Sequence, residues 1–473
     1  MKRLALILGM LTLLLVSLSN AQQRWERTYG GTFSEVGNSV QQTSDGGYIL
    51  TGYTGSFGVG DYDVYLIKTD SIGDTIWTKT YGGMGSDWGN FVQQTSDGGY
   101  IIAGSTRSFG AGGWDVYLIK TNASGDTLWT RTYGGTNDDE GNSVQQTLDG
   151  GYIVAGYTCS FGDTLQDVYL IKTNASGDTL WTRTYGGANP DGGCSVQQTA
   201  DSSYIIAGYT WSFGAGYYDV YLIKTNPSGD PLWTRTYGGA FDEGGNSVQQ
   251  TSDGGYIIAG ATYSFGAGNT DVYLIKTNPS GDTIWTRTYG GTYFDNGQSV
   301  RQTTDGGYIV AGYTGTIYQP SWFDVYLIKT NATGDTLWTR FFGGRDWDFS
   351  YSVQQTTDSG YIIAGYTDSF GAGRADVYLI KTDANGNVGV EENRQGDRET
   401  RRQGERLRAT PNLFTSFATL PGHETERFAL YDVSGRKVGI FRGDRIGEGL
   451  APGVYFLRPE GKDTEPLRIV KVR

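Results

Sequence analysis

Aromatic and acidic side chains gather in the stretches of this 473-residue chain that differ between its internal repeats. An aromatic ring can stack on the apolar face of a sugar, and a nearby carboxylate can accept hydrogen bonds from its hydroxyl groups. These residue types predict binding of a polysaccharide or of a surface protein. The candidate ligand-binding residues are Tyr62, Trp88, Trp114, Trp211, Tyr217, Tyr218, Tyr263, Trp322, Trp347, Asp139 and Asp242.

Histidine-dependent catalysis is excluded from the repeats, because the single histidine, His423, lies outside them. A His-ligated zinc site and a Ser/His/Asp triad both need a histidine beside other groups. A glycoside hydrolase needs only two carboxyl groups about 5–10 Å apart. No carboxylate pair is singled out by the sequence, so we predict no catalytic residue and keep a glycan-active, endoglucanase-like hydrolase as an alternative.

No metal or cofactor is expected. The repeated turns of the type Ser-Asp-Gly-Gly and Asn-Ala-Ser-Gly-Asp supply too few carboxylates for calcium, which takes six to eight oxygen ligands. Hairpin geometry explains these turns. Cys159 and Cys194 are both expected on loops of one face, where they could form a disulfide; the alternative is two independent thiols.

A tryptophan marks each copy of the repeat: Trp25, Trp77, Trp129, Trp181, Trp233 and Trp285 are 52 residues apart, and Trp338 follows after 53. Each copy contains four short β-rich runs. In the second copy these are residues 91–95, 100–106, 115–121 and 127–133, separated by turns or loops. A period near fifty with four strands predicts a β-propeller.

The two ends of the array are offset. The array begins with a lone tryptophan strand, residues 24–29. It ends at residue 382 with a set of three strands that no tryptophan strand follows. Joining them would close a ring and remove two unpaired edges. We therefore predict an all-β fold with a seven-bladed propeller over residues 22–388, with an open solenoid as the alternative.

Residues that recur in every copy are best explained as scaffold. The Asp and Lys of the DVYLIKT runs and the Arg after each Trp are expected to make strand-end hydrogen bonds and ion pairs. The tryptophans are expected to pack between or across outer strands. Function is expected where the copies differ, on the face that carries the second-to-third loops and the connections between blades. We call this the variable face and the opposite one the turn face.

The flanking segments differ from the repeats. Residues 1–21 have a basic start, an apolar stretch and a small-residue cleavage site, which is typical of a signal peptide. Residues 389–408 are charged and predict a disordered linker. Residues 409–473 return to short strands and predict a small Ig-like β-sandwich. Residues 22–388 contain 19 basic and 37 acidic side chains, so the negative charge of the chain lies in the repeats, which argues against nucleic-acid binding.

The C-terminal segment carries three motifs in order. They are LYDVSGRKV (430–438), GLAPGVYFLR (449–458) and the basic-apolar end IVKVR (469–473), preceded by Pro411-Asn412-Leu413-Phe414. They resemble the C-terminal sorting domain of the type IX secretion system, although the entry motif of that family more often reads Asn-Pro-Phe. The resemblance implies that the type IX machinery is a partner of residues 409–473.

The repeats themselves resemble those of secreted bacterial propeller proteins with a QQTSDGGYIIAGYT signature. That resemblance implies a fold rather than an activity. Together these features predict an exported, non-catalytic propeller, secreted or held on the outer surface of a Gram-negative-type bacterium, without a transmembrane segment after signal cleavage. A structural or adhesion protein is a further alternative.

Overall fold

The computed structural model describes residues 24–162, 165–315 and 322–389, and in the C-terminal part residues 413–414, 427–432, 436–442, 444–446, 449–451, 453–459 and 467–471. The chain divides into two compact units, residues 1–391 and 392–473. The expected signal peptide and most of the expected linker lie outside the described residues. Within them, no helix is long and apolar enough to cross a membrane.

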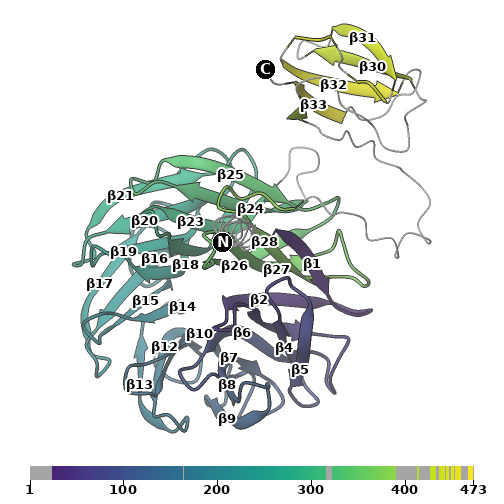
Figure 1. The fold of residues 1–473 in the computed structure, drawn as a ribbon. Helices are drawn as coiled ribbons and strands as arrows, with labels where there is room; N and C mark the ends of the chain where they lie inside the picture. Colours follow the sequence, from purple (N-terminus) through teal and green to yellow (C-terminus); the bar gives the residue numbers. More distant parts are fainter. Residues whose placement is uncertain are drawn as a thin grey trace, which may run out of the picture. The chain divides into compact units, whose positions relative to one another are not determined.

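The first unit is a ring of seven four-stranded antiparallel sheets, which confirms the predicted seven-bladed propeller (Figure 1). From the innermost strand outward, the blades are β2 (Glu35–Gln42), β3 (Tyr48–Thr54), β4 (Asp63–Thr69) and β5 (Thr75–Tyr81); β6 (Asp87–Gln94), β7 (Tyr100–Thr106), β8 (Asp115–Thr121) and β9 (Thr127–Tyr133); β10 (Asp139–Gln146), β11 (Tyr152–Thr158), β12 (Asp167–Thr173) and β13 (Thr179–Tyr185); β14 (Asp191–Gln198), β15 (Tyr204–Thr210), β16 (Asp219–Thr225) and β17 (Pro231–Tyr237); β18 (Glu243–Gln250), β19 (Tyr256–Thr262), β20 (Asp271–Thr277) and β21 (Thr283–Tyr289); β22 (Asp295–Gln302), β23 (Tyr308–Gly315), β24 (Phe323–Thr330) and β25 (Thr336–Phe342); and β26 (Asp348–Gln355), β27 (Tyr361–Thr367), β28 (Asp376–Thr382) and β1 (Trp25–Tyr29).

The first strand of the chain closes the ring. β1 pairs antiparallel with β28, with Trp25 opposite Lys381 and Tyr29 opposite Val377. The seventh blade therefore takes its outer strand from the N-terminal end of the array, as the offset of the repeats predicted. Closure matters because an open array would leave two rows of unpaired backbone groups.

Apolar residues of neighbouring blades pack together to form the core. In one such cluster, Ile101 and Leu118 of the second blade pack with Val144 and Tyr169 of the third. The tryptophans join the same contacts: the Trp77 ring meets the Tyr100 ring of the next blade edge-on, with centroids 6.0 Å apart. The tryptophans thus have the predicted packing role, but each contacts the second strand of the next blade, whereas the sequence analysis expected contacts between or across outer strands.

The repeated charged residues also have structural roles. The Lys120 ammonium, at the end of β8, lies 2.9 Å from an Asp97 carboxylate oxygen in the β6–β7 turn. The Asp97 Oδ1 atom also accepts hydrogen bonds from Thr95 Oγ1 at 2.5 Å and from the Gly99 N–H at 2.9 Å. The corresponding Asp–Lys pair occurs in all seven blades. The turn face is therefore a repeated scaffold.

The described strands of the second unit form one five-stranded sheet, in the order β29 (Leu413–Phe414), β33 (Leu467–Lys471), β32 (Gly453–Pro459), β30 (Arg427–Asp432) and β31 (Lys437–Arg442). Its own apolar cluster contains Phe428, Leu430, Ile446, Tyr455 and Leu457. The apolar runs and turn signals of the sequence predict strands at residues 428–433, 437–441, 453–458 and 467–472, and β30, β31, β32 and β33 match these to within one residue at each end. We expected a sandwich of two sheets, and the described residues of this unit form one sheet.

Candidate functional site on the variable face

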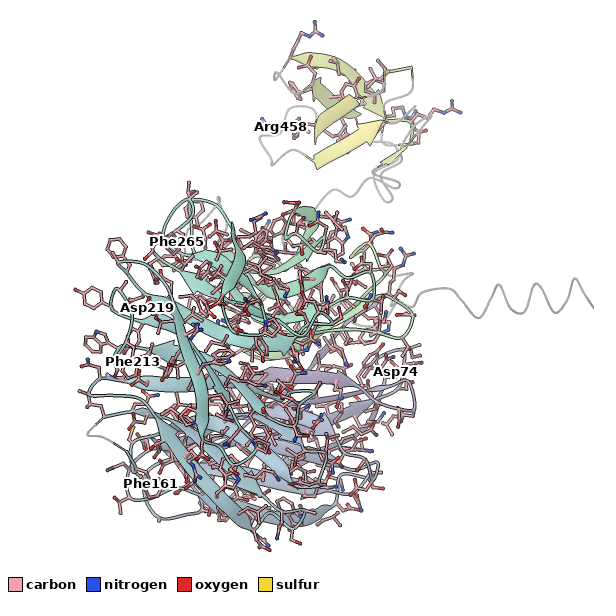
Figure 2. All side chains as sticks on the ribbon, turned by 90° about the vertical axis from the view of Figure 1, so that its left-hand side faces the viewer. Asp74, Phe161, Phe213, Asp219, Phe265 and Arg458 are labelled. Carbon is pink, nitrogen blue, oxygen red and sulfur yellow. The ribbon has the colours of Figure 1, made fainter. Side chains whose placement is uncertain are left out.

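The two faces of the propeller differ as expected from the strand directions. Loops such as β11–β12 and β15–β16 emerge on one side, where Phe161, Phe213 and Phe265 project outward, and Asp74 of the β4–β5 turn lies on the other (Figure 2). The phenylalanines are nearly half exposed, yet each ring packs on a tyrosine of its own blade, as Phe213 does on Tyr221 at 5.8 Å. Their recurrence indicates a scaffold role that the sequence analysis did not single out.

Buried carboxylates form a second repeated feature beneath this face. A glycine follows the outer strand of each blade. Two carboxylates approach it: the first Asp of the third strand of the same blade, and the acidic residue that begins the inner strand of the next blade. At Gly134, a Cβ atom would collide with Asp115 Oδ1 and lie 2.7 Å from Asp139 Oδ2. Burial, and then the neighbouring Asp348 carboxylate, raise the pKa of Asp324 to about 6. Since such pairs recur around the ring, their geometry alone marks no single catalytic pair.

Asp139 belongs to this scaffold, so its assignment as a ligand-binding residue was wrong. Its side chain is fully buried at the start of β10. Asp139 Oδ2 accepts hydrogen bonds from the Gly135 N–H at 2.7 Å and from Ser160 Oγ at 2.6 Å, while Thr158 Oγ1 donates to Oδ1. Because both oxygens already have protein donors and no exposed surface, Asp139 cannot contact a ligand on the surface.

Three of the predicted residues gather between the first and second blades. Trp88 on β6 and Trp114 before β8 have ring centroids 4.4 Å apart, and the Arg107 guanidinium lies 4.6 Å from the Trp114 centroid. Tyr62 reaches Trp88 through Tyr53, at 5.3 and 5.6 Å. Trp114 is only 7 % exposed, which corrects its expected role as an open rim contact. Arg107 and Trp88 cover it.

A second aromatic group lies on the fourth blade. The Trp211 ring is 6.4 Å from Tyr217 and 5.7 Å from Tyr218, and Tyr218 meets the Tyr209 ring edge-on at 5.5 Å. Trp211 and Tyr217 are 40 % and 60 % exposed. The Gln166 Nε2 atom donates to the Tyr209 hydroxyl at 2.7 Å, which fixes that ring. The structure therefore unites Trp211, Tyr217 and Tyr218.

This group borders a hollow of about 330 Å³ that we call the Gly244 hollow. Its lining brings together three predicted residues, Tyr218, Asp242 and Tyr263, from the fourth and fifth blades. Asp242 Oδ1 accepts from the Tyr218 N–H at 3.3 Å, and the Asp242 carbonyl accepts from the Tyr263 N–H at 3.0 Å. The remaining lining residues are Tyr209, Glu243, Gly244, Asn246, Ala261 and Asn296.

One cross-strand pair creates the hollow. Gly244 on β18 lies opposite Ala261 on β19, and a Cβ atom at Gly244 would meet no other atom within 4 Å. At least one residue of the same pair is larger in each other blade: Val36–Tyr53, Trp88–Ser105, Glu140–Tyr157, Gly192–Tyr209, Asn296–Tyr313 and Phe349–Tyr366. A comparison of the copies at these two positions could have found Gly244 and Ala261 from the sequence.

The remaining predicted residues lie apart from the hollow's lining. Trp347 is 46 % exposed and lies 6.4 Å from the Phe349 ring, at the seventh blade. Trp322 is partly buried next to the start of β24. Neither lines the Gly244 hollow, so the eleven candidates do not form one site.

The two cysteines are free thiols, so the possible disulfide is absent from this structure. Cys159 follows β11 on the variable face, as expected. Cys194 instead lies within β14, at the point where its pairing with β15 shifts, and lines the central channel. Burial raises the pKa of the Cys194 thiol to about 12, so it is a poor nucleophile.

No protein-family model matches the chain. The regulatory protein FlaEY of Caulobacter vibrioides is 24 % identical over 219 residues, which cover 39 % of this chain and 23 % of that protein. The chain thus spans less than a quarter of that relative's length.

Some solved structures are similar at low identity, with TM-scores below 0.5. They include the WD40 domain of Pan2 from Neurospora crassa (10 % identity, TM-score 0.43, 73 % of this chain and 89 % of that chain). PorZ, a surface component of the type IX secretion system of Porphyromonas gingivalis, is 11 % identical (TM-score 0.41, 94 % and 60 %). A fungal alcohol oxidase of the AA5 family is 12 % identical (TM-score 0.46, 96 % and 100 %). The fold defines this chain as a β-propeller repeat protein, and these likenesses carry no information on its ligand.

Proposed function

We propose that this protein is a non-catalytic carbohydrate-binding propeller whose site is the Gly244 hollow. The observation that carries the proposal is the pairing of Gly244 with Ala261, which opens a space that a larger residue narrows in every other blade. A volume of about 330 Å³ is at the lower end of the range for ligand pockets, roughly 300–1,000 Å³.

The lining of the hollow suits a sugar. Tyr209, Tyr218 and Tyr263 provide aromatic surface for the apolar face of a sugar ring, and Asp242 supplies a carboxylate acceptor. Asn246 and Asn296 add amide groups, with the Asn246 Nδ2 atom donating to Asn296 Oδ1 at 3.0 Å. A protein partner would more often use a larger surface, roughly 800 Å² on each side.

A glycan array on the mature chain, residues 22–473, tests the proposal. Gly244→Phe should weaken binding of any hit at least about tenfold, because the ring fills the hollow, as Phe349 does at the same position of the seventh blade. Tyr263→Ala should weaken it similarly. The matched control is Trp347→Ala, an equally exposed aromatic residue outside the hollow. Unchanged binding by Gly244→Phe at unchanged stability would refute the site.

The same array distinguishes the alternatives. A reducing-sugar assay on each bound glycan should show no release of new chain ends. Release of sugar would favour the hydrolase alternative. Failure of every glycan to bind would favour a surface-protein ligand or a structural role.

We further propose that the chain is exported to the cell exterior through the type IX system. The sequence motifs support this proposal, and the apolar cluster around Phe428, Leu430 and Leu457 gives residues 409–473 a core of their own. Fusing residues 389–473 to a periplasmic reporter in a type IX-competent host should move the reporter to the surface or the medium. A fusion that truncates the segment before Ile469 is the matched control. Retention of the full fusion in the periplasm would contradict the assignment.

A further inference from the structure

The innermost strands of the seven blades surround a central channel that contains one unusual side chain. Two cavities, of about 310 and 180 Å³, lie along the channel. Asn and Ser side chains line most of the larger cavity, and Val and Gln line most of the smaller one. Arg301 on β22 borders both cavities, and all the other described residues that line them are uncharged.

Arg301 replaces a glutamine that has a defined role in the other six blades. The Gln41 Oε1 atom accepts a hydrogen bond from the Gln94 N–H of the next blade at 2.6 Å, and Gln249 accepts from the Gln302 N–H at 2.6 Å. The corresponding hydrogen bond to the next blade is accepted by Gln93, Gln145, Gln197 and Gln354. A guanidinium has only donors, so Arg301 cannot accept from the Gln355 N–H of the seventh blade. The substitution breaks the glutamine ring at one junction.

The protein itself does little to compensate the charge. The Arg301 Nη1 atom donates to the Val300 carbonyl at 2.7 Å and makes a long contact to Ser247 Oγ at 3.4 Å. These contacts use part of the five-donor fork. Burial lowers the pKa of Arg301, and no carboxylate among the described residues acts to raise it again. Arg301 is partly exposed to the channel, and a desolvated cation without a counter-charge is unfavourable for folding.

We propose that the channel binds one small oxyanion, a carboxylate or a phosphate, against the Arg301 guanidinium. The planar fork of arginine matches the two oxygens of such a group and can bind both at once. The hydroxyl of Ser299 and the amide of Gln298 line the larger cavity beside Arg301 and supply uncharged hydrogen-bonding groups. A volume of 310 Å³ holds about ten waters at ~30 Å³ each, so it accommodates a small solute and not a polymer.

A structural explanation for Arg301 is weaker. Glutamine already satisfies the backbone at this position in six blades, so the fold does not require an arginine. The chain is acidic, with a net charge of −13, so it has no general affinity for anions. Arg301 is therefore not part of a broadly basic surface. The site is separate from the Gly244 hollow, and the proposal does not rest on carbohydrate binding there.

The test is equilibrium dialysis of the mature chain against inorganic phosphate, sodium glucuronate and glucose at constant ionic strength. Phosphate and glucuronate distinguish the two oxyanion classes, and glucose is the uncharged match to glucuronate. We expect saturable binding of one phosphate or one glucuronate per chain, with a dissociation constant at or below about 1 mM, and no binding of glucose.

Arg301→Gln is the decisive variant, because it introduces the residue found in six blades and should fold. It should abolish anion binding and raise the melting temperature in anion-free buffer. Arg301→Lys, which keeps the charge but not the fork, should bind more weakly than the parent. Arg131→Gln, at an exposed arginine paired with Asp178 at 3.4 Å, should bind as the parent does. Absence of saturable binding to the parent, equal binding by Arg301→Gln, or equal binding of glucose would overturn the proposal.

Discussion

The Arg24 guanidinium donates to the Asp383 carboxylate at 3.2 Å across a sequence separation of 359 residues. The contact lies beside the pairing of β1 with β28, where Trp25 is opposite Lys381 and is 7 % exposed. The beginning and the end of the repeat array therefore meet within one blade, and the seventh sheet depends on both.

Removal of the closing strand should destabilise the propeller. Deleting residues 24–29 should lower the free energy of unfolding by at least about 3 kcal/mol, because the deletion exposes the β28 edge and removes the buried Trp25 ring. Arg24→Ala, which removes only the half-exposed partner of one ion pair, should cost no more than about 1 kcal/mol. Urea unfolding measures both. An unchanged midpoint for the deletion would contradict closure through β1.

The turn-face Asp–Lys pair should stabilise the fold in a pH-dependent way. Burial alone would raise the pKa of Asp97, but hydrogen bonds from Thr95 and Lys120 outweigh it and hold the pKa at about 2, below the ordinary 3.8. The folded state therefore favours the charged carboxylate. Its stabilising effect is present above about pH 4 and is lost as the pH falls towards 2.

Asp97→Asn should accordingly lower the free energy of unfolding by about 1 kcal/mol at pH 7, a modest value because the carboxylate is exposed. The difference from the parent should shrink in unfolding curves recorded between pH 4 and pH 2.5. Asp126→Asn, in the exposed pair with Lys79, is the control and should change stability less. A constant difference across this pH range would contradict the role assigned to Asp97.

Replacing glycine with alanine should reduce stability at Gly134 but not at Gly244. Gly134→Ala should destabilise the fold by about 1–3 kcal/mol, because the new Cβ would collide with the buried Asp115 and Asp139 carboxylates. Gly244→Ala should leave stability within about 0.5 kcal/mol, because its Cβ would enter open space. Thermal unfolding of the two variants gives the comparison. Equal losses would mean that the Gly244 hollow is not open in solution.

Cys194 stands where four other blades have asparagine. The Asn142 Nδ2 atom donates to the Gly193 carbonyl of the next blade at 3.0 Å, and Asn38, Asn90 and Asn246 make the same contact. Cys194→Asn should therefore raise the free energy of unfolding by about 0.5–1.5 kcal/mol by donating to Gly245. Cys159→Ser is the control and should be nearly neutral. A destabilised Cys194→Asn variant would contradict this assignment.

Thiol titration tests the state of the cysteines directly. Without reductant, the unfolded chain should react with two equivalents of a thiol reagent, because neither sulfur is bridged. In the folded protein Cys194 should react far more slowly than Cys159, since its thiol lines the channel and desolvation there raises its pKa to about 12. Absence of reactive thiols in the unfolded chain would indicate a disulfide.

The sequence by itself determined the architecture. The spacing of the seven tryptophans, the Asp-Gly turns and the offset of the array ends specified the blades, their strands and the closing strand, because each is a local pattern repeated many times. It also separated a scaffold face from a variable face, since strand direction alone places the loops. The C-terminal strands were likewise placed by alternating apolar residues and turn signals.

Only the tertiary structure decided which variable residues share a site. Asp139 and Asp242 are the same residue type, but Asp139 begins the inner strand β10 and is buried, whereas Asp242 precedes the inner strand β18 and is exposed. Trp114 is covered by Arg107, a contact that no spacing predicts. The Gly244 hollow depends on two small residues in cross-strand register, and the exposure of Arg301 to the channel depends on all seven blades closing around it.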